Sequence, residues 1–263
     1  MKEEDIPAEL YANSDQTQGN FAPSDKLTWA PTGSKQVTVI GGEEKCAFTI
    51  LITITCAGLL LPIQAIYAGK THHSWPSSSV RNYEDLINLG CLLQESGTST
   101  YWSNHQMMHD FVDRILAPYF NAQKQKLGLP ISQKALWSID VWSVHRSAEF
   151  RQWMKENHPN IILDFILGGC TSIAQPCDVG IQRPFKHSMK KSYHKDIVAE
   201  VLEQLKAGED VVTIDTRLPL LRDHSTHWLW NVYQTVNKEA LVKKVNLVCS
   251  LRNVILTREL IGL

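Results

Sequence analysis

The stretch KALWSIDVWSVHRSAEFRQWMKENHPNIILDFIL, residues 134–167, holds the pattern that decides the fold. It opens with a compact apolar run over 134–142 that includes Asp140 near its end, which predicts a strand. Residues 147–159 begin with a serine suited to cap a helix and end at a proline, so they predict a helix. The apolar run over 160–167 predicts another strand. Strands that alternate with helices in this way are typical of an α/β sheet with helices packed on it.

The chain before this stretch is rich in further strand-like runs. They are separated by short polar or glycine-containing segments, as in sheets with tight connections. The predicted strands cover residues 9–17, 36–41, 46–55 and 61–69. With the two later strands they predict a mixed sheet of about five strands.

Helices are predicted on both sides of residues 134–167. Apolar residues recur at helical spacing over 103–126, with Ser103 as the expected N-cap. A long helix is expected over 183–208, ended by Gly208, and further helices over 213–244. Residues 70–100 show little periodicity and no element is predicted there.

Composition limits the function classes. The 263 residues carry 26 Lys and Arg against 27 Asp and Glu, a formal net charge of −1, so a nucleic-acid role must rest on local basic clusters. The six cysteines lack the spacing of zinc ligands and predict reduced thiols of an intracellular protein. The acidic opening MKEEDIPAEL does not have the pattern of a signal peptide.

The uncharged stretch over residues 46–69 is long enough to cross a bilayer. Its first half alternates threonine with bulky apolar residues, and Gly58 and Pro62 then interrupt the run. Two buried strands of a hairpin are therefore the preferred prediction. An integral membrane protein stays as a distant alternative.

Three acids lie at or near the ends of predicted strands or strand-loops: Asp15, Asp140 and Asp178. A rigid sheet can bring such side chains together from distant parts of a chain. Clustered carboxylates repel one another unless hard divalent cations lie between them. Two cations about 3.5–4 Å apart would suit phosphodiester chemistry.

The segments around these acids carry a resemblance. YANSDQT (11–17), WSIDVWSVHRS (137–147) and IAQPCDVGIQRPFK (173–186) resemble the three acidic blocks of pogo/Tigger-like DDE transposases of the mariner-type superfamily. GLLLPIQAIYAGKT (58–71) resembles a hairpin of the same family. The four blocks stand in the family's order and span most of the chain.

The resemblance implies an RNase H-like catalytic core with a mixed sheet, acids on its first and fourth strands, and a third acid at the start of the helix after the fifth. Asp15, Asp140 and Asp178 would then hold two Mg²⁺ or Mn²⁺ ions and act in DNA hydrolysis and strand transfer. His145 matches the family's histidine in the second block and is expected to orient a ligand or phosphate. The same resemblance implies a nuclear protein that binds DNA. It is also compatible with a homodimer.

The cations that follow the third block supply the expected DNA contact. Arg183, Lys186, Lys190 and Lys191 are spaced along the predicted helix after Asp178. Two simpler interpretations remain. The cations form an ordinary solvated face of a helix, and Asp178 only stabilises that helix by its favourable interaction with the dipole at the N-terminus.

Departures from the family support a second hypothesis. Gln16 and Val141 replace residues common in relatives, and no helix-turn-helix module precedes the first acid. The expected organisation is a truncated tail over 1–8, the catalytic core over 9–210, and a helical extension over 211–263 with a degenerate end. A catalytically inactive fragment that binds DNA or protein is therefore the alternative to an active enzyme.

Overall fold

One mixed sheet organises the computed structural model, which describes residues 5–21, 47–166, 169–208 and 213–261. Within these residues the strand order is β4-β3-β2-β1-β5-β6. β2 is antiparallel to both β1 and β3, whereas β5 is parallel to β1 and β6, and β4 is parallel to β3. The strands are β1 (Tyr11–Asn20), β2 (Ala47–Thr55), β3 (Gln64–Tyr67), β4 (Leu92–Glu95), β5 (Ala135–Asp140) and β6 (Ile161–Ile166).

The sheet confirms the fold class expected from the sequence. Strands β3-β2-β1-β5-β6 form the five-stranded mixed core that an RNase H-like fold requires, and β4 adds a sixth strand at the edge. In that core β1 is the first strand and β5 the fourth, so Asp15 and Asp140 lie on the two strands that the resemblance named.

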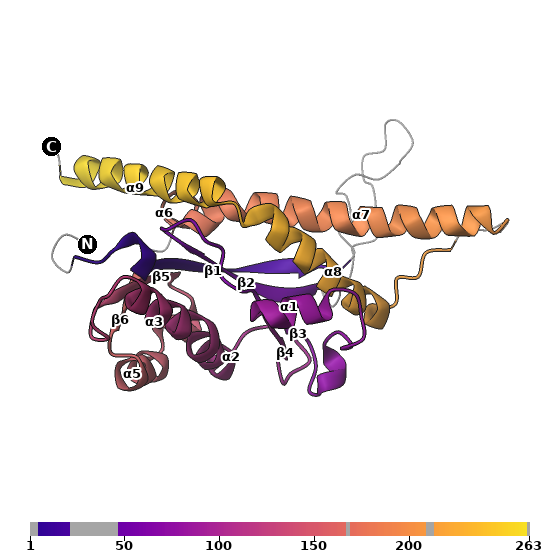
Figure 1. Cartoon of the computed structure of the whole chain (residues 1–263), viewed down its shortest axis with the longest axis horizontal. Coiled ribbons are helices and arrows are strands. Elements are labelled where there is room, and N and C mark those ends of the chain that lie inside the picture. Colours follow the sequence, from indigo (N-terminus) through magenta and orange to yellow (C-terminus); the bar gives the residue numbers. More distant parts are fainter. Residues whose placement is uncertain (1–4, 22–46, 167–168, 209–212, 262–263) are drawn as a thin grey trace, which may run out of the picture.

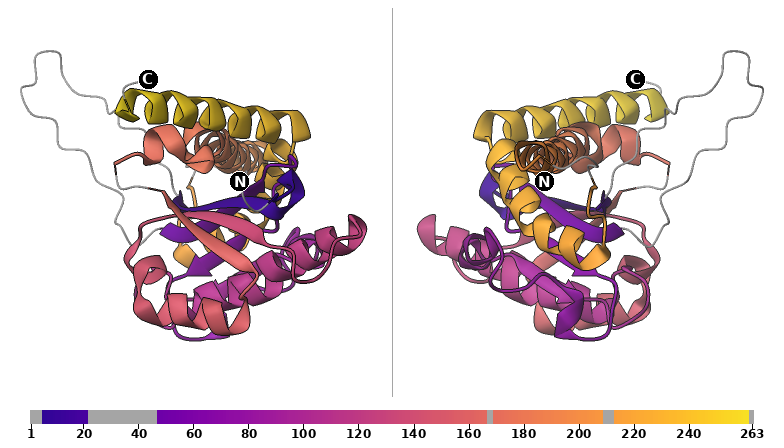
Figure 2. Two further views of the ribbon diagram at one scale, coloured as in Figure 1. Left: turned by 90° about the vertical axis from the view of Figure 1, so that its left-hand side faces the viewer. Right: turned by 90° about the vertical axis from the view of Figure 1, so that its right-hand side faces the viewer.

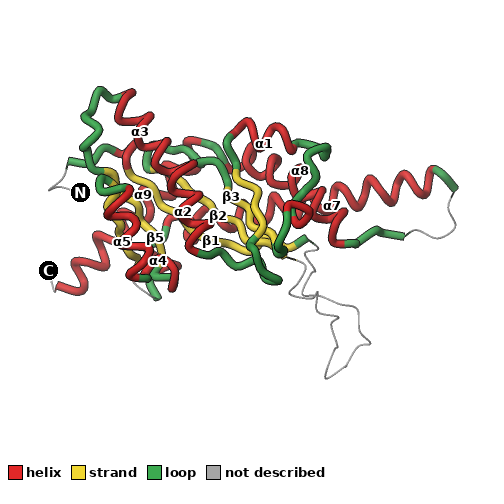
Figure 3. Tube along the Cα trace, turned by 90° about the horizontal axis from the view of Figure 1, so that it is seen from below, coloured by secondary structure: helices red, strands yellow, loops and turns green. Residues whose placement is uncertain are grey.

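Helices cover both faces of the sheet (Figures 1 and 2). Helices α7, α8 and α9 lie over one face, and α2, α3 and α5 lie over the other; Figure 3 shows the second layer in front of the strands. The α-helices are α1 (Tyr83–Leu89), α2 (His105–Phe111), α3 (Ala117–Lys126), α4 (Ser143–Arg146), α5 (Ala148–Asn157), α6 (Thr171–Ala174), α7 (Gln182–Lys206), α8 (Leu218–Val236) and α9 (Glu239–Ile261). Short 3₁₀ turns are η1 (Ala8–Leu10) and η2 (His72–Ser74), and π-helical turns are η3 (Val112–Leu116) and η4 (Cys177–Ile181).

Alternation along the strands gives each face its own core. On β2, Ile50, Ile52 and Ile54 pack with α7, α8 and α9, whereas Leu51 packs with the opposite layer. Every residue of β2 is buried because helices cover both sides. The described part of this run, residues 47–69, thus supplies the internal strands β2 and β3, and among the described residues no helix is long and apolar enough to cross a membrane.

Most predicted elements are confirmed, and the differences have local causes. Ser147 caps α5 by accepting from the Phe150 N–H at 3.0 Å, as expected. Ser103 is the wrong cap for the earlier helix, because Asn104 accepts from the Met107 N–H at 3.1 Å. That helix is also interrupted by the π-helical turn η3.

Besides the turn η2, residues 70–100 contain a helix and a strand that the sequence did not predict. Helix α1 has 7 residues and β4 has 4, which is too short for either hydrophobic period to stand out. The predicted strand over 36–41 lies outside the described residues. The Trp-rich segment of α8 packs in the core, with Trp228 1% exposed.

Candidate active site

The first two predicted acids face each other across adjacent parallel strands. Asn13 on β1 pairs with Ser138 on β5, so the same register carried two residues further sets Asp15 opposite Asp140. Asp140 ends β5, as predicted. Asp15 does not end its strand, because β1 continues to Asn20. The sheet nevertheless turns both carboxylates toward the layer of α7 and α9.

The third acid reaches this face from the π-helical turn η4. Cys177, the residue before Asp178, donates its backbone N–H to Asn13 Oδ1 at 3.0 Å. Cys177 and Ile181 are fully buried, so the turn is fixed against β1 and β2. Asp178 is thereby placed near Asp15, close enough for its negative charge to raise the pKa of the Asp15 carboxyl. The three acids predicted from sequence are brought together.

Their mutual repulsion is visible at Asp15, which is 8% exposed. Burial, and then the negative charges of Asp178 and Asp140, raise the pKa of Asp15 to about 8. The amide of Gln182 opposes this rise. Neighbouring buried carboxylates repel one another unless a proton or a cation lies between them, so this face of the sheet favours bound positive charge.

Gln182, the first residue of α7, ties this helix to β1. Its Nε2 donates to Asp15 Oδ2, and its Oε1 accepts from Thr17 Oγ1 at 3.2 Å. Thr17 is 6% exposed and lies two residues beyond Asp15, on the same face of the strand. The amide is therefore held at both ends by β1.

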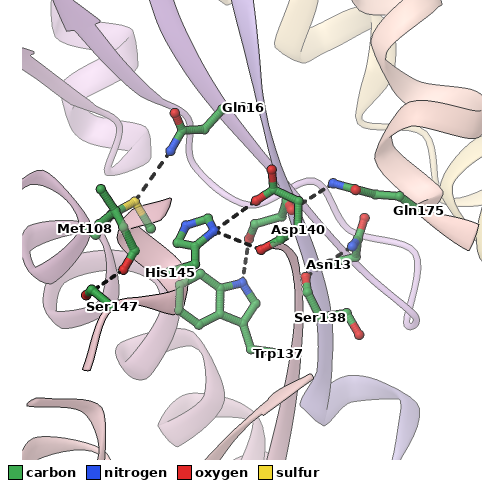
Figure 4. Close-up of polar contacts among 11 residues, drawn as sticks. Asn13, Gln16, Met108, Trp137, Ser138, Asp140, His145, Ser147 and Gln175 are labelled. Atoms are coloured by element: carbon green, nitrogen blue, oxygen red, sulfur yellow. Dashed lines mark hydrogen bonds and ion pairs between the residues drawn. The ribbon is translucent and has the colours of Figure 1, made fainter. Parts of the chain in front are cut away.

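His145 makes the equivalent contact with Asp140 (Figure 4). Its Nδ1 lies 2.9 Å from Asp140 Oδ1 and 3.3 Å from the Asp140 carbonyl oxygen. The His145 side chain is 2% exposed, whereas that of Asp140 is 34% exposed. A ring buried in this way contacts Asp140, and the expected contact of His145 with a phosphate stays a prediction.

Buried hydrogen bonds fix the strands beneath the acids (Figure 4). Trp137 Nε1 donates to Ser14 Oγ at 2.7 Å, and Asn13 Nδ2 donates to the Ser138 carbonyl at 3.1 Å. Gln175 Nε2 donates to the Ser14 carbonyl at 3.3 Å, which links the segment before Asp178 to β1. The acids thus stand on rigid supports, as a preorganised site requires.

A basic face begins next to the acids and follows α7. Phe185, Ser188, Met189 and Ser192 are buried on one side of the helix. The predicted Arg183, Lys186 and Lys191 are exposed, and Lys190 is half-buried. His187, Lys190, Lys191, His194, Lys195 and Val198 line a shallow groove along the same helix.

The donor chemistry of the site suits a hard divalent cation, because carboxylate oxygens are the ligands that Mg²⁺ and Mn²⁺ prefer. Asp15, Asp140 and Asp178 are the residues that could hold one. Within the described part of the chain, no three His, Cys, Asp or Glu side chains are arranged around a common metal position. The acids converge without forming a preassembled cage.

Sequence reasoning missed Gln182 and Thr17. Both positions carry a weak signal: Gln182 lies four residues, about one helical turn, after Asp178, and Thr17 lies two residues after Asp15. An amide or hydroxyl at such a spacing becomes informative only once the acids themselves have been assigned.

The family model for "DDE superfamily endonuclease" matches residues 49–257, well over half of the chain. The chain belongs to the DDE superfamily of endonucleases. The match includes Asp140 and Asp178 and begins on β2, after Asp15. A search of the curated proteins finds no matching relative.

Among solved structures, the chain is similar to a Mos1 strand transfer complex, with 8% identity and a TM-score of 0.46 over 93% of this chain and 52% of that one. It is also similar to a Mos1 mariner paired end complex with Mn, with 10% identity and a TM-score of 0.39 over 86% of this chain and 54% of that one. The chain thus spans about half the length of the transposase chains it matches.

Proposed function

We propose that this DDE chain binds DNA and catalyses metal-dependent phosphodiester hydrolysis and strand transfer. The observation that carries the proposal is the convergence of Asp15, Asp140 and Asp178 on one face of the sheet. The pKa of Asp15 is raised to about 8 there, by burial and by the two neighbouring carboxylates. Membership of the DDE superfamily makes hydrolysis of nucleic acid the chemistry to test first.

In this proposal the three acids hold two Mg²⁺ or Mn²⁺ ions. Such ions, when bound, lower the pKa of water or a 3′-hydroxyl and stabilise the leaving oxygen of a phosphodiester. The chain's own part is to bring the carboxylates together and to fix them on β1, β5 and η4.

The basic face of α7 would guide the DNA backbone toward the acids. Arg183 and Lys195 are 12 residues apart, so the face is about 18 Å long and matches roughly five nucleotides of one strand. A chain with a net charge of −1 needs such a local cluster to attract a polyanion.

A plasmid-nicking assay with Mn²⁺ tests the proposed catalysis. Asp140→Asn keeps the size of the side chain and removes its charge, and we expect it to abolish nicking. Asp113→Asn is the matched control, because Asp113 is an exposed acid on η3 in the opposite layer. Equal nicking by the wild type and Asp140→Asn would show that these acids are not the catalytic site.

The same experiment distinguishes the inactive alternative. DNA binding that weakens with salt, persists in EDTA and is accompanied by no nicking would identify a chain that keeps the fold and only binds. Absence of both binding and nicking would reject both functions.

We also propose that two copies pair through the far half of α7. Val198, Leu202 and Leu205 are 56%, 49% and 54% exposed and follow one another at helical spacing. An antiparallel pairing of two such helices about Leu202 would bury these side chains of the two copies against one another. Sedimentation equilibrium should show a dimer for the wild type and a monomer for Leu202→Glu; a wild-type monomer would reject the pairing.

Because the proposed substrate is DNA, we propose a nuclear location as well. Imaging of the fluorescently tagged chain in a eukaryotic cell tests this, and exclusion from the nucleus would count against it.

A further inference from the structure

The two strand acids are held in the same way, each by one nitrogen from a neighbouring element. Gln182 Nε2 donates to one oxygen of Asp15, and His145 Nδ1 contacts one oxygen of Asp140. Neither contact was expected from the sequence. In each case the nitrogen engages a single carboxylate oxygen and leaves the second oxygen of that carboxylate for another partner.

The Gln182 amide cannot turn freely about its own axis. The Asp15 carboxylate only accepts, so Nε2 of the amide faces Asp15 Oδ2, and Thr17 Oγ1 donates to the other end of the amide, Gln182 Oε1. Asp15 is 8% and Thr17 6% exposed, so water does not compete strongly for either contact. The orientation of the Asp15 carboxylate is therefore coupled to the start of α7, four residues after Asp178.

The His145 ring is fixed by packing. Its centroid lies 6.2 Å from that of Trp137, 5.3 Å from that of Trp142 and 6.1 Å from that of Phe150. Nδ1 faces the Asp140 carbonyl oxygen, which can only accept, as well as the Asp140 carboxylate. Nδ1 therefore carries a proton and donates a hydrogen bond to Asp140.

The surroundings of the other nitrogen, Nε2, show whether His145 only fills space or positions Asp140. Nε2 is buried and has no hydrogen-bond partner in the described part of the chain. Burial of a polar atom without a partner costs about 1–3 kcal/mol. An apolar side chain would fill this space between aromatic rings without that cost, so packing alone does not explain the histidine.

We infer that Gln182 and His145 are positioning residues that orient the carboxylates of Asp15 and Asp140, each by binding one oxygen and leaving the second for a divalent cation. This inference rests on the proposed function. Partners of this kind, hydrogen-bonded to the ligands of a metal, typically change metal affinity 10- to 100-fold when they are removed.

Mn²⁺ binding, followed by the decrease of the electron paramagnetic resonance signal of free Mn²⁺, tests the inference without any catalytic readout. His145→Asn places an amide nitrogen close to the position of Nδ1, whereas His145→Gln extends it toward the position of Nε2. We expect His145→Asn to keep Mn²⁺ affinity within about threefold and His145→Gln to weaken it roughly 10- to 100-fold. Equal affinities, or the reverse order, would overturn the role of His145.

A double-mutant cycle tests Gln182 in the same assay. Gln182→Leu removes the amide at nearly constant size and should weaken Mn²⁺ binding roughly tenfold. Thr17→Val removes only the donor that orients the amide and should have a smaller effect. If Thr17 acts through Gln182, the double variant binds Mn²⁺ no more weakly than Gln182→Leu. Fully additive effects would overturn the coupling.

The outcomes separate this inference from the function on which it rests. A wild type that does not bind Mn²⁺ would reject the metal-dependent function and, with it, any positioning of metal ligands. A wild type that binds while all variants bind equally would reject positioning alone. Near-UV circular dichroism identifies variants that do not fold; if His145→Gln is one of them, His145→Asn and the Thr17–Gln182 cycle still decide.

Discussion

At the scale of single residues, Asp15 shows what a cluster of acids costs a protein without a bound cation. The ordinary pKa of its carboxyl is 3.8, and in the folded chain this pKa is about 8, because burial and two neighbouring carboxylates oppose ionisation. Between these values the unfolded chain binds fewer protons than the folded chain. The free energy of unfolding therefore falls as pH rises from about 4 to about 8.

We predict that Asp15→Asn stabilises the metal-free protein at pH 8 and has little effect at pH 4. The variant removes the charge, so the gain at pH 8 should be at least about 1.4 kcal/mol, the equivalent of one pKa unit. Urea denaturation in EDTA at both pH values measures the difference. A variant that is less stable than the wild type at pH 8 would contradict the repulsion described here.

The residue scale is also where the sequence both succeeds and falls short. Asp15, Asp140 and Asp178 were chosen among the 27 Asp and Glu residues because their segments resemble the three acidic blocks of the family. Gln182 could not, since a glutamine that binds a carboxylate looks like any other glutamine on a helix. His145 was found, but its burial between Trp137 and Phe150 depends on packing that no local pattern encodes.

At the scale of elements, the turn that carries Asp178 is held in place by α9. Gly180 in η4 lies so close to this helix that a Cβ at residue 180 would be 2.3 Å from Val245 Cγ2. We predict that Gly180→Ala lowers the free energy of unfolding by about 1–3 kcal/mol, because the added methyl overpacks this part of the core. Urea denaturation measures the change.

The partner of Gly180 supplies the control. Val245→Ala leaves a small cavity and should destabilise the protein by itself. In the double variant the methyl of residue 180 occupies part of that cavity, so the total destabilisation should be smaller than the sum of the two single effects. Additive effects would show that the two side chains do not compete for the same space.

Helix α7 has a buried face and an exposed basic face, and we predict that the exposed face binds DNA. Replacement of Arg183, Lys186 and Lys191 by Gln should weaken DNA binding and lower the slope of log K against log salt by about 0.9 for each phosphate that is no longer neutralised. Lys155→Gln on α5, which is an exposed lysine in the opposite layer, is the matched control. Fluorescence anisotropy at several salt concentrations measures both slopes, and an unchanged slope in the triple variant would remove α7 from the DNA interface.

At the scale of the whole molecule, periodicity predicted the central sheet well because β1, β2, β5 and β6 are long enough to show it. The edge strand β4 and helix α1 escaped, since each has too few residues for a period. The boundary expected at residue 210 stays a prediction.

Helices α8 and α9 complete the core on the acid-bearing face of the sheet. Burial of one large apolar side chain contributes about 1.5–3 kcal/mol, so the seven that these helices supply contribute on the order of 10–20 kcal/mol. These seven side chains are Leu221, Trp228, Leu229, Val232, Val236, Val242 and Val245, and Tyr233 of α8, which donates its hydroxyl to the Leu60 carbonyl at 3.0 Å, is buried beside them.

We therefore predict that residues 1–210 do not fold without α8 and α9. Circular dichroism and a thermal melt should show no cooperative transition for this fragment, because the apolar face of β2 and β3 would be open to water. A fragment of residues 1–250 retains all seven side chains and should melt cooperatively. If residues 1–210 melted like the longer fragment, these residues would fold by themselves. Helix α9 would then not be needed to hold Asp178 beside Asp15.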